Sequence, residues 1–113
     1  MARPLPRIAE RRDFLHAAAS GRKSAQPGLV LQAAHGRSEG FRIGFTATRK
    51  LGNAVIRNRA RRRLRAAADR VLRADPPAGW DIVLIGRAGT LDRPFEALCE
   101  DLRRALARTG VRT

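Results

Sequence analysis

The segment from Asn53 to Arg73 constrains this chain more than any other part of the sequence. At about 100° per residue, a helix over this segment gathers its apolar side chains within an arc of about 80°. These side chains are Ile56, Ala60, Leu64, Ala67 and Val71. Arginines cover the remainder, namely Arg57, Arg59, Arg61, Arg62, Arg63 and Arg65. The sequence therefore predicts an amphipathic helix with a narrow apolar stripe and a basic surface.

The charge of this region indicates a polyanionic partner. Between Arg49 and Arg73 ten side chains are cationic, and the one acidic residue is Asp69. Like charges three or four residues apart on a helix repel each other, so an ordinary solvated surface mixes the two signs. The whole chain of 113 residues carries a formal net charge of +14. Phosphates would relieve this repulsion, and the planar guanidinium group suits them, so nucleic acid is the expected partner.

Composition narrows the class of protein. A chain of 113 residues with 43% hydrophobic residues can bury one core, and we expect a single domain over residues 1–113. No apolar run approaches the roughly 18 residues that span a bilayer, and residues 1–12 are basic without a following apolar segment. The basic helix also lacks the large apolar side chains of a membrane-surface helix. We expect a cytoplasmic protein with no membrane partner.

The first part of the chain predicts a helix followed by a strand. Ile8, Phe14, Leu15 and Ala18 recur near helical spacing, which favours a helix over residues 6–21 that ends at Gly21. We expect a polar loop over residues 22–28, a strand over residues 28–32 and a hairpin turn over residues 35–40.

The next strand, over residues 41–48, alternates in character. One set of side chains is suited to a core, namely Phe41, Ile43, Phe45 and Ala47. The other set faces the opposite side, namely Arg42, Gly44, Thr46 and Thr48. Because successive side chains of a strand point to opposite faces, this second face is able to meet a ligand.

The last part of the chain predicts a buried strand and a closing helix. The nearly continuous apolar run from Trp80 to Gly86 is typical of a strand covered on both faces. Apolar residues then recur at helical spacing from Phe95 and predict a helix that ends near Gly110, with Thr90 and Asp92 as candidate caps.

Few side chains suggest protein-borne chemistry. The single cysteine, Cys99, lies on the apolar stripe of the closing helix, where we expect a buried, inert thiol and no disulfide or metal site. His16 and His35 each stand alone, without a nearby arrangement of Cys, Ser or carboxylate side chains that would mark a nucleophile or a general base, so we expect no catalytic side chain. Trp80 is expected to pack rather than to stack on a base.

Asn58 leaves two interpretations open. Its amide lies between Arg57 and Arg59 on the basic helix and could bind a base edge or a 2′-hydroxyl. It could equally make a structural bond to the preceding loop, although Asn53 is the better candidate for the helix cap.

The segment from Thr48 to Arg65, TRKLGNAVIRNRARRRLR, resembles the hallmark of the bacterial ribonuclease P protein family. That hallmark is an Arg-Asn-Arg helix entered through a Lys-x-Gly-Asn-Ala-Val turn, and both parts are present. The resemblance continues at Arg12-Asp13-Phe14, Arg42 to Phe45, Asp81 to Ile85 and Phe95 to Leu106. It therefore covers most of the chain.

The resemblance implies a fold and an activity. The fold would be an α/β, single-domain, two-layer sandwich of a four-stranded sheet and three helices, with the basic helix in a left-handed βαβ crossover, although right-handed crossovers dominate in proteins. The activity would be that of ribonuclease P, in which a catalytic RNA uses Mg²⁺ to remove the 5′ leader of precursor tRNA by hydrolysis. The protein would bind no cofactor itself, support metal binding by the RNA, and act as a monomer in the holoenzyme.

The resemblance also implies two binding surfaces. The catalytic RNA would be bound by Arg49, Lys50, Asn53, Arg57, Asn58, Arg59, Arg61, Arg62 and Arg65. A cleft between the first helix and the sheet would hold the 5′ leader through Arg12, Phe14, Ala18, Gln32, Thr46 and Thr48. The family often has aromatic residues where Ala18 and Gln32 stand, so we expect this cleft to rely less on stacking and more on arginine and hydroxyl contacts.

Three other functions fit parts of the sequence. A ribosomal or other structural RNA-binding protein would share the charge and the fold class. A DNA-binding helix-turn-helix module fits poorly, because residues 75–79 lead from the basic helix into a strand instead of a second helix. A stand-alone nuclease would have to cut precursor tRNA in the absence of a catalytic RNA.

Overall fold

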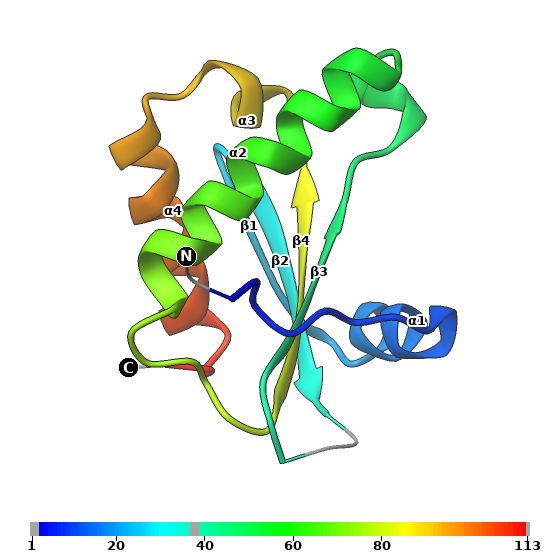
Figure 1. Ribbon diagram of the computed structural model, residues 1–113, viewed down its shortest axis with the longest axis vertical. Helices are drawn as coiled ribbons and strands as arrows, with labels where there is room; N and C mark the ends of the chain where they lie inside the picture. Colours follow the sequence, from blue (N-terminus) through cyan, green and yellow to red (C-terminus); the bar gives the residue numbers. More distant parts are fainter. Residues whose placement is uncertain (1–2, 37–38, 113) are drawn as a thin grey trace.

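The protein is described from a computed structural model, and the description covers residues 3–36 and 39–112. The chain forms one mixed sheet with helices on both of its faces (Figure 1). Its elements are, in order, α1 (Arg11–Ala19), β1 (Arg22–Gln26), β2 (Leu29–His35), β3 (Arg42–Thr46), the 3₁₀ helix η1 (Arg49–Leu51), α2 (Ala54–Leu72), β4 (Trp80–Gly86), α3 (Ala88–Asp92) and α4 (Phe95–Arg108).

The four strands lie in the order β1-β2-β4-β3. The pairs β1–β2 and β2–β4 are antiparallel, whereas β3 and β4 are parallel. The sheet continues beyond β3, because Ile8 donates its N–H to the Ile43 carbonyl at 2.9 Å and Ile43 donates its own to the Pro6 carbonyl at 2.9 Å. The N-terminal segment therefore covers an edge that would otherwise be open.

The connection from β3 through α2 to β4 is a left-handed crossover, as expected. Both strands run upward in Figure 1, α2 lies in front of them, and β4 lies to the left of β3. Parallel neighbours require such a long connection, and its left hand is the rare one. This crossover places the whole length of α2 on one face of the sheet.

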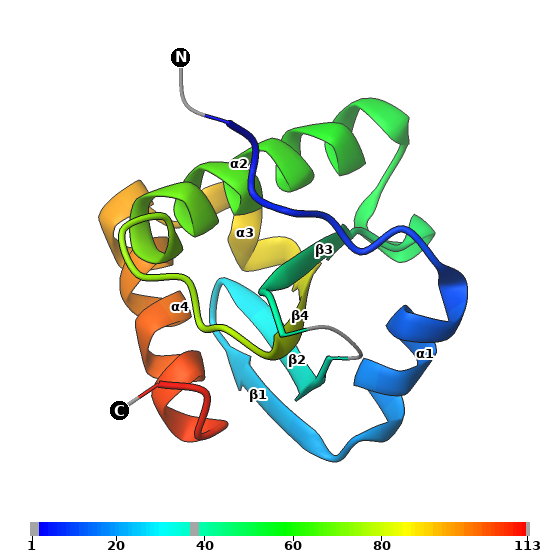
Figure 2. The same ribbon diagram turned by 60° about the horizontal axis from the view of Figure 1, so that its bottom comes forward.

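The main core lies between the sheet and the pair α2 and α4. The fully buried side chains of this core include Leu31, Ile43, Leu64, Ile82, Leu84, Leu98, Leu102 and Leu106. A smaller cluster on the opposite face joins Ile8, Ala17, Ala34 and Val83, with Phe14 and Ile85 packed against it. Figure 2 shows the sheet between α2 and α4 on one side and α1 on the other. The strand β4 is thus covered on both faces, which confirms the expectation from its continuous apolar run.

Two expectations about the early strands are wrong. Residues 22–26 form β1 instead of a loop, because they pair with β2. Ser24 and Gln26 of this strand are buried, and Gln26 donates its amide to the Ser24 hydroxyl at 2.9 Å. The turn over residues 35–40, of which 37–38 lie outside the described residues, does not close a hairpin. The strand β4 lies between β2 and β3, and β2 forms its hairpin with β1. The polar sequence of β1 contains no apolar periodicity that would predict a strand. The pairing of β2 with β4 joins residues far apart in the chain, so no local pattern predicts it.

The first helix is shorter than expected and turns a different side to the sheet. It begins at Arg11, because residues 6–8 are extended along β3. Its buried residues are Asp13 and Ala17, whereas Leu15 is 54% exposed and Ala18 is also exposed. The apolar spacing was misleading because a buried carboxylate, anchored by an arginine of the sheet, takes the place of an apolar contact.

The C-terminal part contains one helix more than expected. Thr90 lies within α3, where its hydroxyl accepts a hydrogen bond from the Arg87 N–H at 2.9 Å and donates one to the Gly28 carbonyl. The cap position of α4 is Pro94, which supplies no side-chain hydrogen bond. Thr90 and Asp92 therefore do not cap the closing helix. The helix itself, from Phe95 to Arg108, agrees with its periodicity.

Candidate nucleic-acid interface

The turn before α2 fixes where the basic helix begins. Gly52 has a φ of 151°, and a Cβ at this position would lie 2.9 Å from the Ile56 Cδ1. Asn53 then accepts a hydrogen bond through its side-chain oxygen from the Ile56 N–H at 3.0 Å. Asn53 is therefore the helix cap, as its position indicated. The Gly-Asn pair aims the first turn of α2 away from the end of β3.

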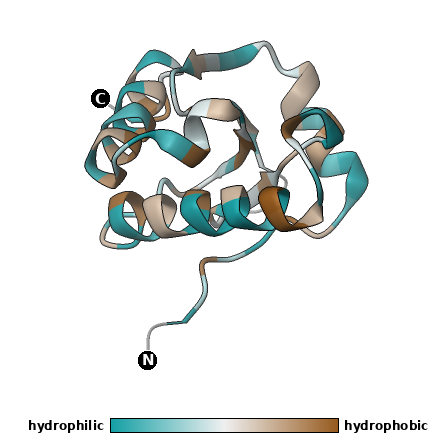
Figure 3. Cartoon of the chain, turned by 90° about the horizontal axis from the view of Figure 1, so that it is seen from above, coloured by the Kyte–Doolittle hydropathy of each residue, from teal (hydrophilic) through white to brown (hydrophobic). Residues whose placement is uncertain are grey.

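The basic side chains of α2 surround three sides of the helix. Ala60, Leu64, Ala67, Ala68 and Leu72 face the core and are fully buried. Opposite them, Asn58, Arg59, Arg62 and Arg65 are exposed, and Arg61 and Arg63 lie half-buried on the two flanks. Figure 3 shows hydrophilic and hydrophobic positions alternating along α2. The exposed side of α2 is therefore a continuous basic surface, which we name the α2 surface.

Arg57 departs from this pattern. It precedes the fully buried Leu64 by seven residues, which places both on the same side of the helix. Arg57 is half-buried, and its Nε is shielded from solvent without a hydrogen-bond partner among the described residues. The helical pattern of the sequence predicts that Arg57 lies on the basic arc, and this prediction is wrong. The structure places it on the core-facing side of the helix, in the first turns of α2.

Charge compensation differs between the two ends of α2. Within residues 3–36 and 39–112, no carboxylate pairs with the arginines at 57, 59, 61, 62 or 65. At the other end, Arg70 binds Glu96 with Nη2 at 2.6 Å from Oε1, and Arg73 pairs with Asp69. The unpaired positive charge is therefore concentrated in the N-terminal half of the helix, where a polyanion would gain most.

Asn58 bonds along its own helix. Its side-chain oxygen accepts a hydrogen bond from the Arg61 Nη1 at 2.7 Å, and both residues also line a shallow hollow on the α2 surface with Val55, Arg62 and Arg65. Asn58 is exposed, and its amide nitrogen has no hydrogen-bond partner within the described part of the chain. The expected alternative, a structural bond to the preceding loop, is wrong.

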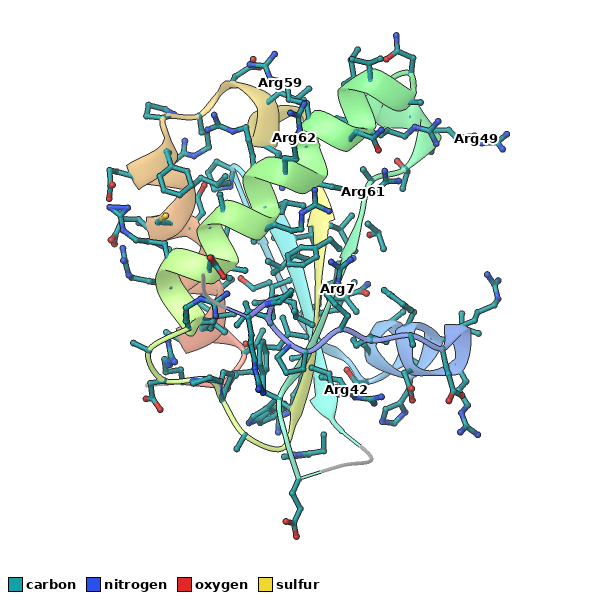
Figure 4. All side chains as sticks on the ribbon, in the orientation of Figure 1. Arg7, Arg42, Arg49, Arg59, Arg61 and Arg62 are labelled. Atoms are coloured by element: carbon teal, nitrogen blue, oxygen red, sulfur yellow. The ribbon has the colours of Figure 1, made fainter. Side chains whose placement is uncertain are left out.

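Arg49 and Lys50 extend the basic surface beyond the helix. Both are exposed on η1, and Figure 4 shows Arg49 projecting away from the body of the protein. Lys50 and Thr48 line a pocket of about 260 Å³ together with Arg87, the residue that follows β4. Arg87 was not among the residues expected from the sequence. Only the parallel pairing of β3 and β4 brings the two strand ends together, so no local signal could have identified it.

The face of the sheet that packs against α1 gathers part of the second predicted set. Gln32, Val83 and Gly44 lie in one row across β2, β4 and β3, and Val30, Ile85 and Thr46 lie in the next. Phe14 of α1 lies directly over Gly44, where an added Cβ would be 2.4 Å from the Phe14 Cε1. Phe14, Gln32 and Thr46 therefore share this surface, which we name the α1 face.

The other members of that set lie around the α1 face. Ala18 follows Phe14 by one helical turn and is exposed. Thr48 lies beyond the end of β3, and Arg12 is an exposed residue of α1 whose Nε is 2.8 Å from the Glu10 Oε2. The structure thus brings Phe14, Ala18, Gln32 and Thr46 to one side of the sheet. It places Arg12 and Thr48 at the periphery.

An arginine of β3 holds α1 against the sheet. Arg42 binds Asp81 of β4, with Nε at 3.0 Å from Oδ1 and Nη2 at 2.6 Å from Oδ2, and its Nη1 lies 3.3 Å from the Asp13 Oδ2. Asp13 and Asp81 are 3% and 1% exposed. Hydrogen bonding to Asp81 raises the pKa of Arg42, because it stabilises the charged guanidinium group. The position of Phe14 on the sheet depends on this buried pair.

The described residues offer no protein site for a metal ion. Within residues 3–36 and 39–112, no three His, Cys, Asp or Glu side chains come close enough to bind one together. The buried carboxylates of Asp13 and Asp81 face Arg42, and the Asp101 carboxylate accepts the Gly28 N–H at 3.0 Å and contacts Arg93. These donors are already neutralised by cations and do not fit Mg²⁺. Burial raises the pKa of the Cys99 thiol, which agrees with an inert residue.

None of the described helices combines the length and the apolar character that a membrane span requires.

Similarities in sequence and in structure connect this chain to the same protein family. The family model described as Ribonuclease P matches residues 3–110. The Ribonuclease P protein component of Gluconacetobacter diazotrophicus is 56% identical over 114 residues, which cover 99% of this chain and 97% of the relative. That of Paramagnetospirillum magneticum is 50% identical, over 98% and 87% of the two chains.

Solved structures with the same fold carry the same family name. The RNase P protein of Staphylococcus aureus superimposes with a TM-score of 0.76 at 26% identity, over 93% of this chain and 95% of that one. The RNase P protein from Thermotoga maritima gives a TM-score of 0.73 at 29% identity, over 90% and 96%. The chain belongs to the ribonuclease P protein family, the protein components of an endoribonuclease that contains RNA.

Proposed function

We propose that this protein completes ribonuclease P by using two separate surfaces, one for the catalytic RNA and one for the 5′ leader of precursor tRNA. The α2 surface would dock the catalytic RNA. The α1 face would hold the single-stranded leader. The observation that carries this proposal is the uncompensated charge of the N-terminal half of α2, where five arginines lack an acidic partner within the described residues.

Binding of the catalytic RNA by the α2 surface follows from charge and geometry. Arg59, Arg62 and Arg65 project from one side of a rigid helix, so they can neutralise phosphates of a folded RNA without first being ordered. Asn58 would present its amide nitrogen to a base edge or a 2′-hydroxyl between these contacts. Arg49, Lys50 and Asn53 lie at the start of the same helix and would extend the contact. The matching family membership supports this assignment over that of a ribosomal protein.

Binding of the leader by the α1 face follows from the half-buried residues that α1 and the sheet present there. Phe14 supplies one aromatic ring, and Gln32 and Thr46 supply hydrogen-bonding groups on neighbouring strands. Ala18 and Gln32 provide no second ring, so hydrogen bonds would contribute more than stacking does, and stacking of a base on an aromatic ring stabilises by about 1–3 kcal/mol. Arg12 and Thr48 would contact the leader where it enters and leaves this face.

The protein's own residues would position RNA and leave the hydrolysis to the catalytic RNA. The Mg²⁺ ions of that reaction would be bound by RNA, with the protein's positive field holding the two RNA molecules close together. Residues 1–113 would act as one RNA-binding domain, as a monomer within the holoenzyme and in the cytoplasm, where precursor tRNA is processed.

Reconstitution tests the proposal directly. Purified protein is added to a ribonuclease P RNA transcript at low Mg²⁺, and cleavage of a precursor tRNA is measured. We expect the protein to restore 5′ leader removal, and the protein without the RNA to leave the precursor intact. Cleavage by the protein alone would assign the chemistry to protein side chains and overturn the proposal.

A further inference from the structure

We infer that a shallow pocket between α2 and the start of α4 receives one unpaired base of the RNA that docks on the α2 surface. The pocket has a volume of about 320 Å³ and is lined by Arg59, Arg62, Arg63, Ala66 and Phe95. The inference rests on the proposed RNA docking. It adds a contact from α4 that would recognise a base, whereas the arginines of α2 recognise phosphates.

The floor of the pocket is apolar and rigid. Phe95 is the first residue of α4 and is half-buried, because it also packs against the main core. Ala66 of α2 lies beside it and is exposed. The ring is held by the core on one side and by Arg70, whose Cζ lies over it, and the surface that remains lines the pocket. A ring fixed in this way provides a stacking surface at little cost in side-chain entropy. Every base has a π face, so such a surface accepts an unpaired base of any sequence.

The rim of the pocket is cationic. Arg59 and Arg62 are exposed, lack a carboxylate partner within the described parts of the chain, and project from the side of α2 that faces α3 and α4 (Figure 4). Arg63 is different, because its guanidinium group donates a hydrogen bond to the Arg93 carbonyl and forms part of the wall. A base on Phe95 would therefore have its flanking phosphates within reach of Arg59 and Arg62.

A compensated ion pair beside the pocket limits the occupant to a single nucleotide. Arg70 lies with its Cζ 5.7 Å from the centre of the Phe95 ring, and its Nη2 binds the Glu96 carboxylate at 2.6 Å. The positive charge beyond Phe95 is therefore already compensated. A nucleic-acid backbone would turn back toward Arg59 and Arg62 rather than continue past Glu96, because the paired Arg70 and Glu96 leave no net positive charge there to bind a phosphate.

The test measures binding of the full-length protein to a ribonuclease P RNA transcript. Phe95→Leu keeps an apolar side chain but removes the ring, and we expect it to weaken binding about five- to a hundredfold. Phe95→Tyr keeps the ring and should bind within about twofold of the original protein. Ala66→Gln fills the pocket from an exposed position outside the core and should weaken binding in the same range as Phe95→Leu. Leu15→Ala changes an exposed apolar residue of α1 and serves as the matched control.

Two further measurements separate stacking from charge and from failure of the proposed function. Phe95→Leu should leave the slope of log affinity against log salt unchanged, because it removes no phosphate contact. Chemical probing of the RNA should show one or two unpaired nucleotides that the original protein protects and that stay reactive in the Phe95→Leu and Ala66→Gln complexes.

Native affinity and footprint in both variants would overturn the pocket assignment while leaving RNA docking intact. If circular dichroism shows that Phe95→Leu alone does not fold, the affinity and the footprint of Ala66→Gln test the pocket assignment. An original protein that binds the transcript without steep salt dependence would instead overturn the proposed function.

Discussion

Arg42 of β3 donates two hydrogen bonds to Asp81 on the neighbouring strand β4, at 3.0 and 2.6 Å, and the same guanidinium group lies 3.3 Å from Asp13 of α1. The pair lies under α1 and connects it to both β3 and β4. Because Phe14 is carried by α1, the geometry of the α1 face depends on a contact that itself touches no RNA.

Replacement of Arg42 should therefore destabilise the fold. Arg42→Ala leaves the buried carboxylates of Asp13 and Asp81 without their guanidinium group, and we expect the free energy of unfolding in urea to fall by about 2–4 kcal/mol. Arg12→Ala removes only an exposed pair with Glu10 and should change it by less than about 1 kcal/mol. Equal losses in the two variants would contradict the anchoring role of Arg42.

Gly44 is the position on β3 where a methyl group should disturb α1. A Cβ there would overlap the Phe14 ring at 2.4 Å, and the ring packs against the small buried cluster on this side of the sheet. We expect Gly44→Ala to cost about 1–3 kcal/mol of unfolding free energy and to weaken binding of a leader-bearing precursor tRNA by the holoenzyme. Gly40→Ala meets no atom within 4 Å and is the control. A fully stable Gly44→Ala protein with normal leader binding would show that Phe14 lies elsewhere.

Affinity for the catalytic RNA should depend steeply on salt. If the α2 surface and η1 neutralise six to ten phosphates, log affinity falls against log salt with a slope of about −0.7 to −0.9 per contact. Arg59→Ala should reduce the steepness by about one contact, whereas Arg108→Ala, on exposed α4 surface, should leave it unchanged. A slope near −2 for the original protein would exclude the α2 surface as the docking site.

The two proposed surfaces should separate by mutation. Arg59→Ala should weaken assembly with the catalytic RNA more than it weakens the preference for a precursor tRNA with a leader over mature tRNA. Phe14→Ala should have the opposite effect, because Phe14 lies on the other side of the sheet from α2. Filter binding of the RNA and competition between the two tRNAs measure these effects. Parallel losses of both properties in both variants would argue for one shared surface.

The Cys99 thiol should be unreactive in the folded protein. It is fully buried, and burial raises its pKa, so the neutral thiol predominates further into the alkaline range than it does for a free cysteine. Ellman's reagent at pH 8 should modify it only at the rate of unfolding and should react at once in denaturant. Rapid modification without denaturant would show that α4 is not packed as described.

Local patterns in the sequence determined the elements that carry their own apolar faces. The stripe of α2, the alternation of β3, the buried run of β4 and the periodicity of α4 each specified an element that the structure contains. Asn53 also identified the start of α2, because a helix cap is a local requirement. The family was recognisable from this same segment, which the family model confirms.

Contacts between distant parts of the chain decided the rest. The polar strand β1 exists because β2 pairs with it, and β4 enters between β2 and β3, so the apparent hairpin never forms. The side of α1 that faces the sheet depends on the contact between Arg42 and Asp13, which lie 29 residues apart in the sequence. The burial of the Arg57 Nε likewise results from the way α2 packs in the folded chain. Tertiary packing also places Arg87 beside Lys50 and Phe95 beside Arg62. Hydrophobic periodicity encodes which side of an element is buried, but partners in a sheet and pairs of buried charges are chosen only when the whole chain closes on itself.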